Sequence, residues 1–195
     1  MSLRYETLTG AAIGAVIDGL AQLRIAVFRD WPYLYDGDLD YERDYLSGYQ
    51  TTPSALVVAA YDGADLVGAS TGLPLMQADA EFADAFAGTS HDPARIFYCA
   101  ESVLLPACRG QGAGHRFFDL REAHARAQGF AQSAFCSVMR PADHPDRPSG
   151  YRPLDAFWRG RGYVPVPGAI ARFHWRDLGE ARESEKPLQF WMRDL

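Results

Sequence analysis

Residues 96–129 constrain the fold of this chain more than any other segment does. The apolar run at 96–105 predicts a buried strand, the glycines at 110–114 predict a loop, and the periodicity of 113–128 predicts an amphipathic helix. Glycines let consecutive amides point into one small volume, and a helix start adds unsatisfied N–H groups and a positive dipole end. The junction therefore predicts a phosphate-binding site, with a glycine turn that serves only tight packing as the alternative.

Two common phosphate-binding motifs do not fit this junction. A Walker loop ends in Gly-Lys-Ser or Gly-Lys-Thr, but here Gly114 is followed by His115. The dinucleotide fingerprint Gly-x-Gly-x-x-Gly, counted from Gly110, requires its third glycine one position later than Gly114. The sequence therefore argues against a nucleotide triphosphatase and against a dinucleotide-dependent enzyme.

A third motif does fit. The pattern Arg109-x-x-Gly112-x-Gly114, preceded by an apolar run at 103–105 and by Pro106, resembles the acyl-CoA signature of the GNAT superfamily of N-acyltransferases. The resemblance implies acetyl-CoA, or a related acyl-CoA, as cosubstrate, with its pantetheine arm along the strand and its pyrophosphate on the loop amides. The residues to which it assigns cofactor binding are Val103, Leu104, Leu105, Arg109, Gly110, Gln111, Gly112, Ala113, Gly114 and His115.

A second match lies downstream and contains a departure. Residues 157–163, Phe-Trp-Arg-Gly-Arg-Gly-Tyr, resemble the Phe-Tyr-x-x-x-Gly-Phe that precedes the sixth strand in the family. The family's tyrosine often protonates the leaving coenzyme A thiolate, but this chain has Trp158 there. An indole N–H donates a hydrogen bond and is no acid near neutral pH. The proton must then come from water or from another residue such as Tyr151 or Tyr163, or the protein does not catalyse.

The resemblance implies an α/β fold with a mixed, mostly antiparallel sheet, in which strands 4 and 5 form a splayed parallel pair, and with flanking helices. The residue patterns predict elements in a similar order. Strands are expected at 2–8, 54–61, 65–72, 95–105, 132–139, 163–166, 169–175 and 188–192, and helices at 11–28, 38–49, 77–87 and 113–128. No linker or charge block divides the 195 residues, so we expect one domain at 1–195.

Charged residues interrupt the pattern of two predicted helices. Arg24 lies on or near the apolar stripe of the helix at 11–28. In the helix at 113–128, Glu122 is expected on a solvated face, whereas His124 falls inside the apolar stripe. A histidine there is expected to form a hydrogen bond at the edge of the core, and we assign it no function.

Glu101 is the best candidate for a general base. It lies within an otherwise apolar strand, where a buried carboxylate must find a partner. An amine nucleophile must lose a proton before it attacks a thioester, and similar strand-four glutamates play that part in some GNAT enzymes. Tyr151 is the second catalytic candidate. The alternative role for Glu101 is a salt bridge to a neighbouring loop arginine.

Residues 29–38 are the densest aromatic and acidic segment of the chain. In the GNAT layout this region forms a wall of the acceptor pocket. Aromatic faces and nearby carboxylates suit an amine, through cation–π attraction and charge pairing. We therefore expect Trp31, Tyr33, Tyr35 and Asp36 to bind the acceptor. The alternative is an aromatic loop that only packs over the sheet.

Composition limits the partners and the location. The net charge of −6 argues against a nucleic-acid partner. The three cysteines form no Cys-x-x-Cys pair, and their odd number predicts a reducing, cytoplasmic location. We find no leader and no apolar run near ~18 residues, and so expect no membrane span. His144 has too few ligands nearby for a metal site. The aromatic residues beyond position 169 could form a homodimer interface.

The sequence thus predicts a cytoplasmic N-acyltransferase, in the first instance an N-acetyltransferase. It would transfer the acyl group of acetyl-CoA or a related acyl-CoA to an amine of a small molecule or peptide. Because Trp158 replaces the usual acid, a non-catalytic acyl-CoA-binding or sensing protein on the same fold is the alternative. A dimeric scaffold with a vestigial loop is a third hypothesis.

Overall fold

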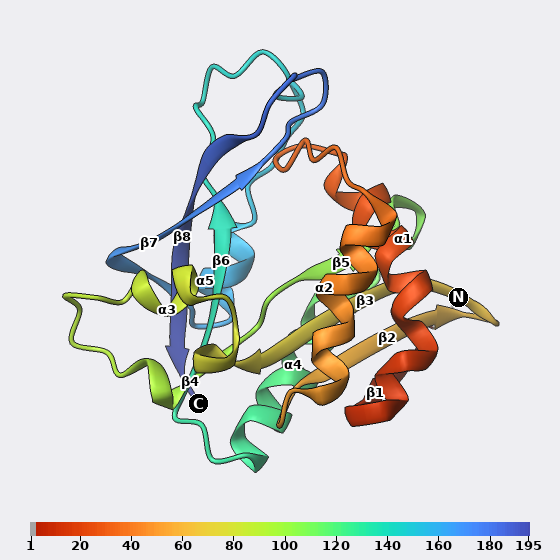
Figure 1. Cartoon of the computed structure of the whole chain (residues 1–195), viewed down its shortest axis with the longest axis vertical. Coiled ribbons are helices and arrows are strands. Elements are labelled where there is room, and N and C mark those ends of the chain that lie inside the picture. The colour runs from red at the N-terminus through yellow and green to blue at the C-terminus, as the bar shows by residue number, and fades with distance from the viewer. Residues whose placement is uncertain (1–2) are drawn as a thin grey trace.

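The computed structural model describes residues 3–195, which form one eight-stranded sheet flanked by helices (Figure 1). The strands are β1 (Arg4–Leu8), β2 (Leu56–Asp62), β3 (Asp65–Pro74), β4 (Ile96–Tyr98), β5 (Ser102–Leu104), β6 (Gln132–Val138), β7 (Val164–Trp175) and β8 (Ser184–Asp194). Their order is β1-β2-β3-β4-β6-β8-β7, with β5 paired to β3. The pair β4 and β6 is parallel, and the other pairs are antiparallel. The mixed sheet expected from the sequence is confirmed.

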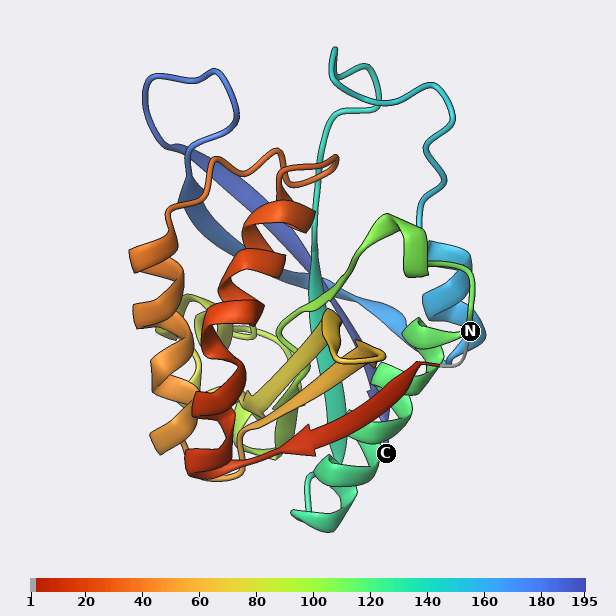
Figure 2. The same ribbon diagram turned by 90° about the vertical axis from the view of Figure 1, so that its right-hand side faces the viewer.

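Helices cover both faces of this sheet. They are α1 (Ile17–Phe28), α2 (Leu39–Thr51), α3 (Ala80–Asp84), α4 (Ala113–Ala127) and α5 (Asp155–Gly160). Figure 2 shows α1 and α2 on one face and α4 on the other. Successive side chains of a strand point to opposite faces. Val57 and Ala59 of β2 therefore join the core under α1 and α2, whereas Leu56 and Val58 join the core under α4.

The strand predicted at 95–105 is in fact broken at residues 99–101. The last main-chain hydrogen bond that the described residues place between the parallel strands runs from Cys99 N to Ala134 O, at 2.7 Å. Beyond it β5 pairs with β3, while β6 continues along β8 as far as Val138. The splayed pair is therefore formed by β5 and β6.

Other predicted elements differ in extent. The helix predicted at 77–87 shrinks to α3, preceded by a 3-10 turn at Leu75–Gln77. The strands predicted at 163–166 and 169–175 merge into β7, whose pairing with β8 shifts between Pro165 and Ile170. Residue 2, the first of the predicted strand at 2–8, lies outside the described residues.

Glu122 is buried rather than solvated, which corrects the prediction for its helix face. Its carboxylate accepts hydrogen bonds from Arg161 at 3.1 Å and from Arg193 at 3.5 Å. Both arginines come from the C-terminal third of the chain, so the local helix pattern could not predict that they pair with Glu122 and shield it from solvent. His124 is as expected: its ring nitrogen lies 2.8 Å from the carbonyl oxygen of Ser54, at the edge of the core.

The 3-10 turn at Gly10–Val16 leads directly into α1 and lengthens this helical segment. An 18-residue window of the segment from Gly10 to Phe28 reaches a mean hydropathy of 1.6, so by length and composition alone the segment could cross a membrane. In the fold, however, Ile13, Leu20 and Leu23 are buried against the sheet. One face of the segment therefore packs against the sheet.

Candidate functional site

Arg121 of α4 fixes the break between β4 and β5. Its Nη1 donates to the carbonyl oxygens of Glu101, at 2.8 Å, and of Thr71, at 3.2 Å, while its Nη2 donates to Ser102 Oγ at 2.9 Å. Both carbonyl oxygens also accept main-chain bonds between β3 and the break, from Thr71 N at 3.1 Å and from Ala100 N at 3.2 Å, so the guanidinium adds a second donor to each. This side chain lies about 20 residues further along the chain, outside the range of a local strand pattern.

The glycine loop leads from β5 into α4, as predicted. Gly110 and Gly112 have φ values of +78° and +83°, in the left-handed region that favours glycine. A Cβ added to Gly114 would lie 3.3 Å from the Phe157 ring, so a larger side chain would crowd this position. The amides of 110–115 donate no hydrogen bond within residues 3–195. Six amides at the start of a 15-residue helix are therefore available to an anion.

One edge of β5 carries no strand partner within residues 3–195. The carbonyl of Glu101 and the amide of Leu105 bond to β3, at 3.1 and 2.9 Å. Main-chain groups alternate between the two edges of an antiparallel strand, so those of Leu104 face away from β3, and its carbonyl oxygen accepts from Arg109 Nε at 3.2 Å. Among the predicted arm-binding residues 103–105, Leu104 therefore presents its main chain to the open edge.

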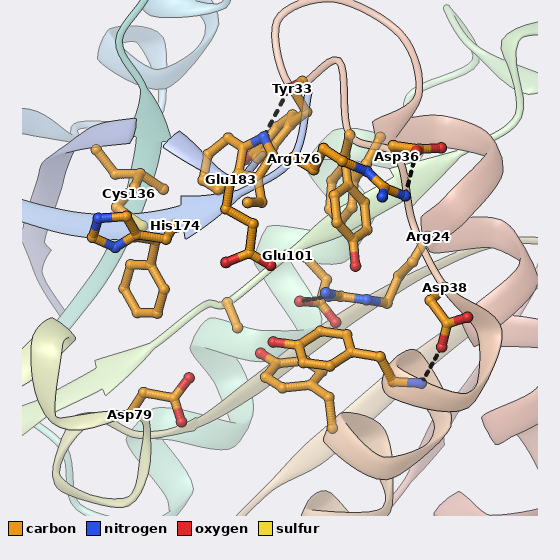
Figure 3. A pocket seen from close by; sticks show the side chains of 18 of the residues that line it. Arg24, Tyr33, Asp36, Asp38, Asp79, Glu101, Cys136, His174, Arg176 and Glu183 are labelled. Atoms are coloured by element: carbon orange, nitrogen blue, oxygen red, sulfur yellow. Dashed lines mark hydrogen bonds and ion pairs between the residues drawn. The ribbon is translucent and has the colours of Figure 1, made fainter. Parts of the chain in front are cut away.

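A cavity of about 590 Å³ lies on the α1 and α2 face of the sheet (Figure 3). Its inner wall includes Tyr98 and Glu101 from the broken strand and Cys136 from β6, so it reaches the point where the strands splay. Burial raises the pKa of the Cys136 thiol to about 12, so this cysteine is protonated and no nucleophile. Aromatic side chains form much of the remaining wall: Phe28, Tyr33, Tyr35, Tyr41, Tyr45, Phe82, Phe173 and Trp175.

Arg24 of α1 joins two buried carboxylates at the inner end of the cavity. Its Nε donates to Glu42 Oε2 on α2, and its Nη1 pairs with Glu101 Oε2. The side chain of Glu42 is fully buried and that of Glu101 is 6% exposed. Burial alone would lower the pKa of Arg24, but the two carboxylates outweigh it and raise that pKa, so Arg24 is a permanent cation.

One guanidinium therefore serves two carboxylates. The Oε1 atoms of Glu42 and Glu101 have no hydrogen-bond partner among residues 3–195. Only Glu101 of the two lines the cavity. Since a buried carboxylate oxygen without a donor is costly, the free oxygen of Glu101 favours a ligand that brings a cation or a donor. The salt bridge considered for Glu101 does form, with an arginine of a helix instead of a loop. Arg24 and Glu42 were missed as site residues, although an arginine in an apolar stripe is a signal that could have found them.

The predicted acceptor residues divide into two groups. Three of them line the cavity: Tyr33, Tyr35 and Asp36. The fourth, Trp31, and the predicted catalytic Tyr151 do not belong to that lining. Their rings pack against each other, with centroids 5.9 Å apart, and Trp31 also packs on His144 at 5.1 Å. Trp31 therefore joins the loop at 29–38 to the loop at 140–154.

Arg140, which follows β6, fixes the acceptor loop in place. It forms two bonds with the Asp177 carboxylate, at 2.6 and 2.9 Å. It also donates to the carbonyl oxygens of Pro32, at 2.8 Å, and of Tyr33, at 2.6 Å. One buried side chain thus ties the end of β6 and the β7–β8 connection to the loop that carries Tyr33. No local pattern in the sequence predicts this pairing.

The candidates for protonating a leaving thiolate have different surroundings. Tyr163 is buried, its hydroxyl donates to Glu122 Oε1 at 3.1 Å and lies 2.8 Å from Ser133 Oγ, and burial raises its pKa. Trp158 packs among the aromatic residues of the same core. Both are therefore structural parts of the face under α4. Tyr151, in the loop at 140–154, is only partly buried.

Comparison with solved structures identifies the fold. The structure resembles ribosomal-protein-alanine N-acetyltransferase from Brucella melitensis, with a TM-score of 0.60 at 13% identity over 100% of both chains. It resembles a GCN5-related N-acetyltransferase from Kribbella flavida, with a TM-score of 0.59 at 14% identity over 99% of this chain and 98% of that one. The chain has the GNAT fold. No family model and no curated protein matches the sequence.

A further GNAT-fold neighbour was solved with a ligand. It is yncA from Salmonella typhimurium with its cofactor acetyl-CoA, which matches with a TM-score of 0.58 at 14% identity over 100% of this chain and 95% of that one. In the GNAT fold of the present chain, β5 and β6 are the splayed pair and the glycine loop opens α4. Within residues 3–195, no group of three or more His, Cys, Asp or Glu could hold a metal ion.

Proposed function

We propose that the protein is an N-acyltransferase that transfers the acetyl group of acetyl-CoA, or a related acyl group, to an amine of a small molecule or peptide. One observation carries this proposal. The Glu101 carboxylate lies at the break between β4 and β5, lines the aromatic cavity, and keeps one oxygen without a partner among residues 3–195. A carboxylate therefore lies where the aromatic cavity meets the splayed strands, which supports the proposal of a proton acceptor there.

The available anion site suits the proposed cosubstrate. The glycine loop offers six amides and a helix start to a pyrophosphate, and the open edge at Leu104 suits an arm with amide groups. An acyl-CoA bound there supplies an activated acyl group as a thioester. The residues that would hold it are those of the loop at 109–115 and of β5.

The proposed reaction assigns a role to the cavity, to Glu101 and to Tyr151. The acceptor binds in the aromatic cavity as an ammonium ion, and Glu101 accepts one of its protons. The free amine nitrogen attacks the thioester carbonyl carbon, the new C–N bond forms, and the C–S bond breaks. Coenzyme A leaves as a thiolate that takes up a proton, for which Tyr151 is the candidate donor within this chain. The acylated nitrogen releases its second proton, which balances the proton taken up by the thiolate and restores the donor. Alignment of amine and thioester supplies most of the rate enhancement.

Calorimetric titration of acetyl-CoA into wild type and Gly112→Asp tests the proposal. Aspartate places bulk and negative charge at the predicted pyrophosphate site, so binding to the variant should fall below detection. Gly88→Asp is the matched control, because Gly88 has a φ of +82° and equally open surroundings but lies in the connection after α3. Lack of wild-type binding would refute the acyltransferase proposal.

The alternative function is a non-catalytic acyl-CoA-binding or sensing protein. The burial of Tyr163 and the presence of Trp158 favour it, because neither offers an acid to a leaving thiolate. Thiol release across a panel of primary amines separates the two functions. Acetyl-CoA binding without thiol release from any amine would support the sensor, and turnover would support the enzyme.

A further inference from the structure

Carboxylates outnumber cations along the cavity. Five carboxylates line it: Asp36, Asp38, Asp79, Glu101 and Glu183. Three arginines line it as well: Arg24, Arg176 and Arg182. Two of these arginines are already engaged, since Arg24 pairs with Glu42 and Glu101, and Arg176 pairs with Asp36 at 2.6 Å. The uncompensated charge of the cavity is therefore negative.

The excess charge has an inner and an outer location. At the inner end, Glu101 shares the Arg24 guanidinium with Glu42, which lies outside the lining, and keeps one oxygen without a donor among residues 3–195. Toward the outside, Asp79 and Glu183 form no ion pair within the described part of the chain, where Arg182 is their one unpaired counterpart in the lining. Figure 3 shows both outer carboxylates directed toward the space in front of Glu101.

Asp79 also borders a second, smaller cavity of about 140 Å³, which shares Tyr45 and Phe82 with the first. The two cavities therefore adjoin, and Asp79 lies where they meet. Its side chain does not cap α3, which begins at the next residue. Burial, together with the neighbouring Glu81 carboxylate, raises the pKa of Asp79, so a nearby ammonium group would relieve an unfavourable charge.

Between these two locations the wall is aromatic. Tyr33 and Tyr45 lie toward the inner end, where Arg24 already packs over the Tyr45 ring at 4.6 Å. Phe82 follows the outer carboxylate of Asp79 by three positions and lines both cavities. An alkyl chain between two cations would pack on these rings, and ring faces attract ammonium groups.

We propose that the acceptor is a linear diamine or polyamine, whose reacting amine lies at Glu101 and whose second ammonium group binds between Asp79 and Glu183. This acceptor class rests on the proposed acyltransferase function. A peptide with a free N-terminus and no basic side chain would bring one cation, which would leave the outer carboxylates of Asp79 and Glu183 without a partner. A diamine places one ammonium group at each of the two acidic locations.

The test compares 1,4-diaminobutane and 1,6-diaminohexane with butylamine and hexylamine, by thiol release from acetyl-CoA. We expect kcat/KM to be about tenfold higher for a diamine than for its matched monoamine. In Asp79→Asn this ratio should fall about threefold, because the lost pairing is at a partly exposed site. Asp84→Asn, an exposed carboxylate of α3 outside the cavity lining, is the control and should leave the ratio unchanged.

Each outcome decides one part of the proposal. Thiol release with equal kcat/KM for diamine and monoamine would refute the second cation site and leave the acyltransferase function standing. Calorimetric binding of 1,6-diaminohexane that Asp79→Asn weakens, without thiol release from any amine, would support the cation site and refute the transfer. Release that depends on chain length but not on Asp79 would also overturn the assignment of the second site.

Discussion

Arg121 donates a hydrogen bond of 2.8 Å to the carbonyl oxygen of Glu101. The same helix, α4, carries the glycine loop at its start, so one rigid element links the predicted phosphate site to the main chain of the proposed base. A small shift of α4 would therefore move both groups together. This link assigns Arg121 a positioning role, since its side chain is buried and the cavity lining does not include it.

Arg121→Met tests that role. Methionine retains most of the volume but removes three charge-assisted hydrogen bonds, to the carbonyl oxygens of Glu101 and Thr71 and to Ser102 Oγ, so the unfolding free energy should fall by about 3 kcal/mol. Urea denaturation measures the change. Arg126→Met, on the same helix but with a half-exposed side chain, should change stability by less than about 0.5 kcal/mol. Equal effects of the two substitutions would contradict the anchoring role.

Local patterns predicted the parts of the fold that local forces determine. The hairpin of β2 and β3 follows from Asp62-Gly63, where Gly63 adopts a φ of +61°. The glycine loop follows from residues that must adopt positive φ. The break at 99–101 could not be predicted in this way, because Arg121 reaches it from another element.

The residues of the candidate site likewise divide into those that local patterns predict and those that only the fold brings together. Glu101 was found because a carboxylate in an apolar strand is conspicuous, and Tyr33 and Tyr35 because aromatic residues cluster in one loop. The partners of these residues were not found. Arg140 lies in a proline-rich connection, and only the fold brings it to the loop that contains Tyr33. An arginine in an apolar stripe can signal a buried ion pair, but a single sequence does not identify its distant partner.

Glu101→Gln separates a base from a structural anchor. Glutamine keeps the shape but cannot accept the proton, so thiol release should fall about 10²- to 10³-fold, while calorimetric binding of acetyl-CoA is retained. Glu42→Gln is the matched comparison: it removes the other carboxylate from Arg24 but lies outside the cavity lining. It should reduce the rate by less than about tenfold. If the two variants lose activity equally, Glu101 serves only to hold Arg24.

The Asp177 and Arg140 pair predicts a pH-dependent stability. Burial by itself would raise the pKa of Asp177, but the Arg140 guanidinium and the Lys186 ammonium outweigh it and lower that pKa below the ordinary 3.8. A carboxylate with a lowered folded pKa stabilises the fold above its unfolded pKa, and this contribution is lost as the pH falls through the folded pKa.

Urea unfolding of wild type and Asp177→Asn at pH 7 and at pH 3 measures this contribution. The substitution should cost about 3 kcal/mol at pH 7, because it leaves buried cations without their counterion. The difference between the two proteins should shrink at pH 3. Asp18→Asn breaks an exposed pair with Arg43 and should cost less than about 1 kcal/mol at both pH values. A difference that grows toward pH 3 would contradict the assigned sign.

Tyr151→Phe and Tyr163→Phe locate the proton donor to the leaving thiolate. Tyr163 is bonded to Glu122 and Ser133 within the core, so its loss should lower the unfolding free energy by about 1 kcal/mol and leave the rate of thiol release unchanged. Tyr151 is partly buried, packs on Trp31, and has a pKa raised by burial and by Asp155, so its hydroxyl is protonated at neutral pH. Its loss should slow thiol release about tenfold or more with little effect on stability.

If neither substitution slows release in a protein that turns over, water protonates the thiolate. If Tyr163→Phe alone slows release, the core tyrosine must be reached by the cosubstrate, and the separation drawn between the two faces of the sheet would be wrong.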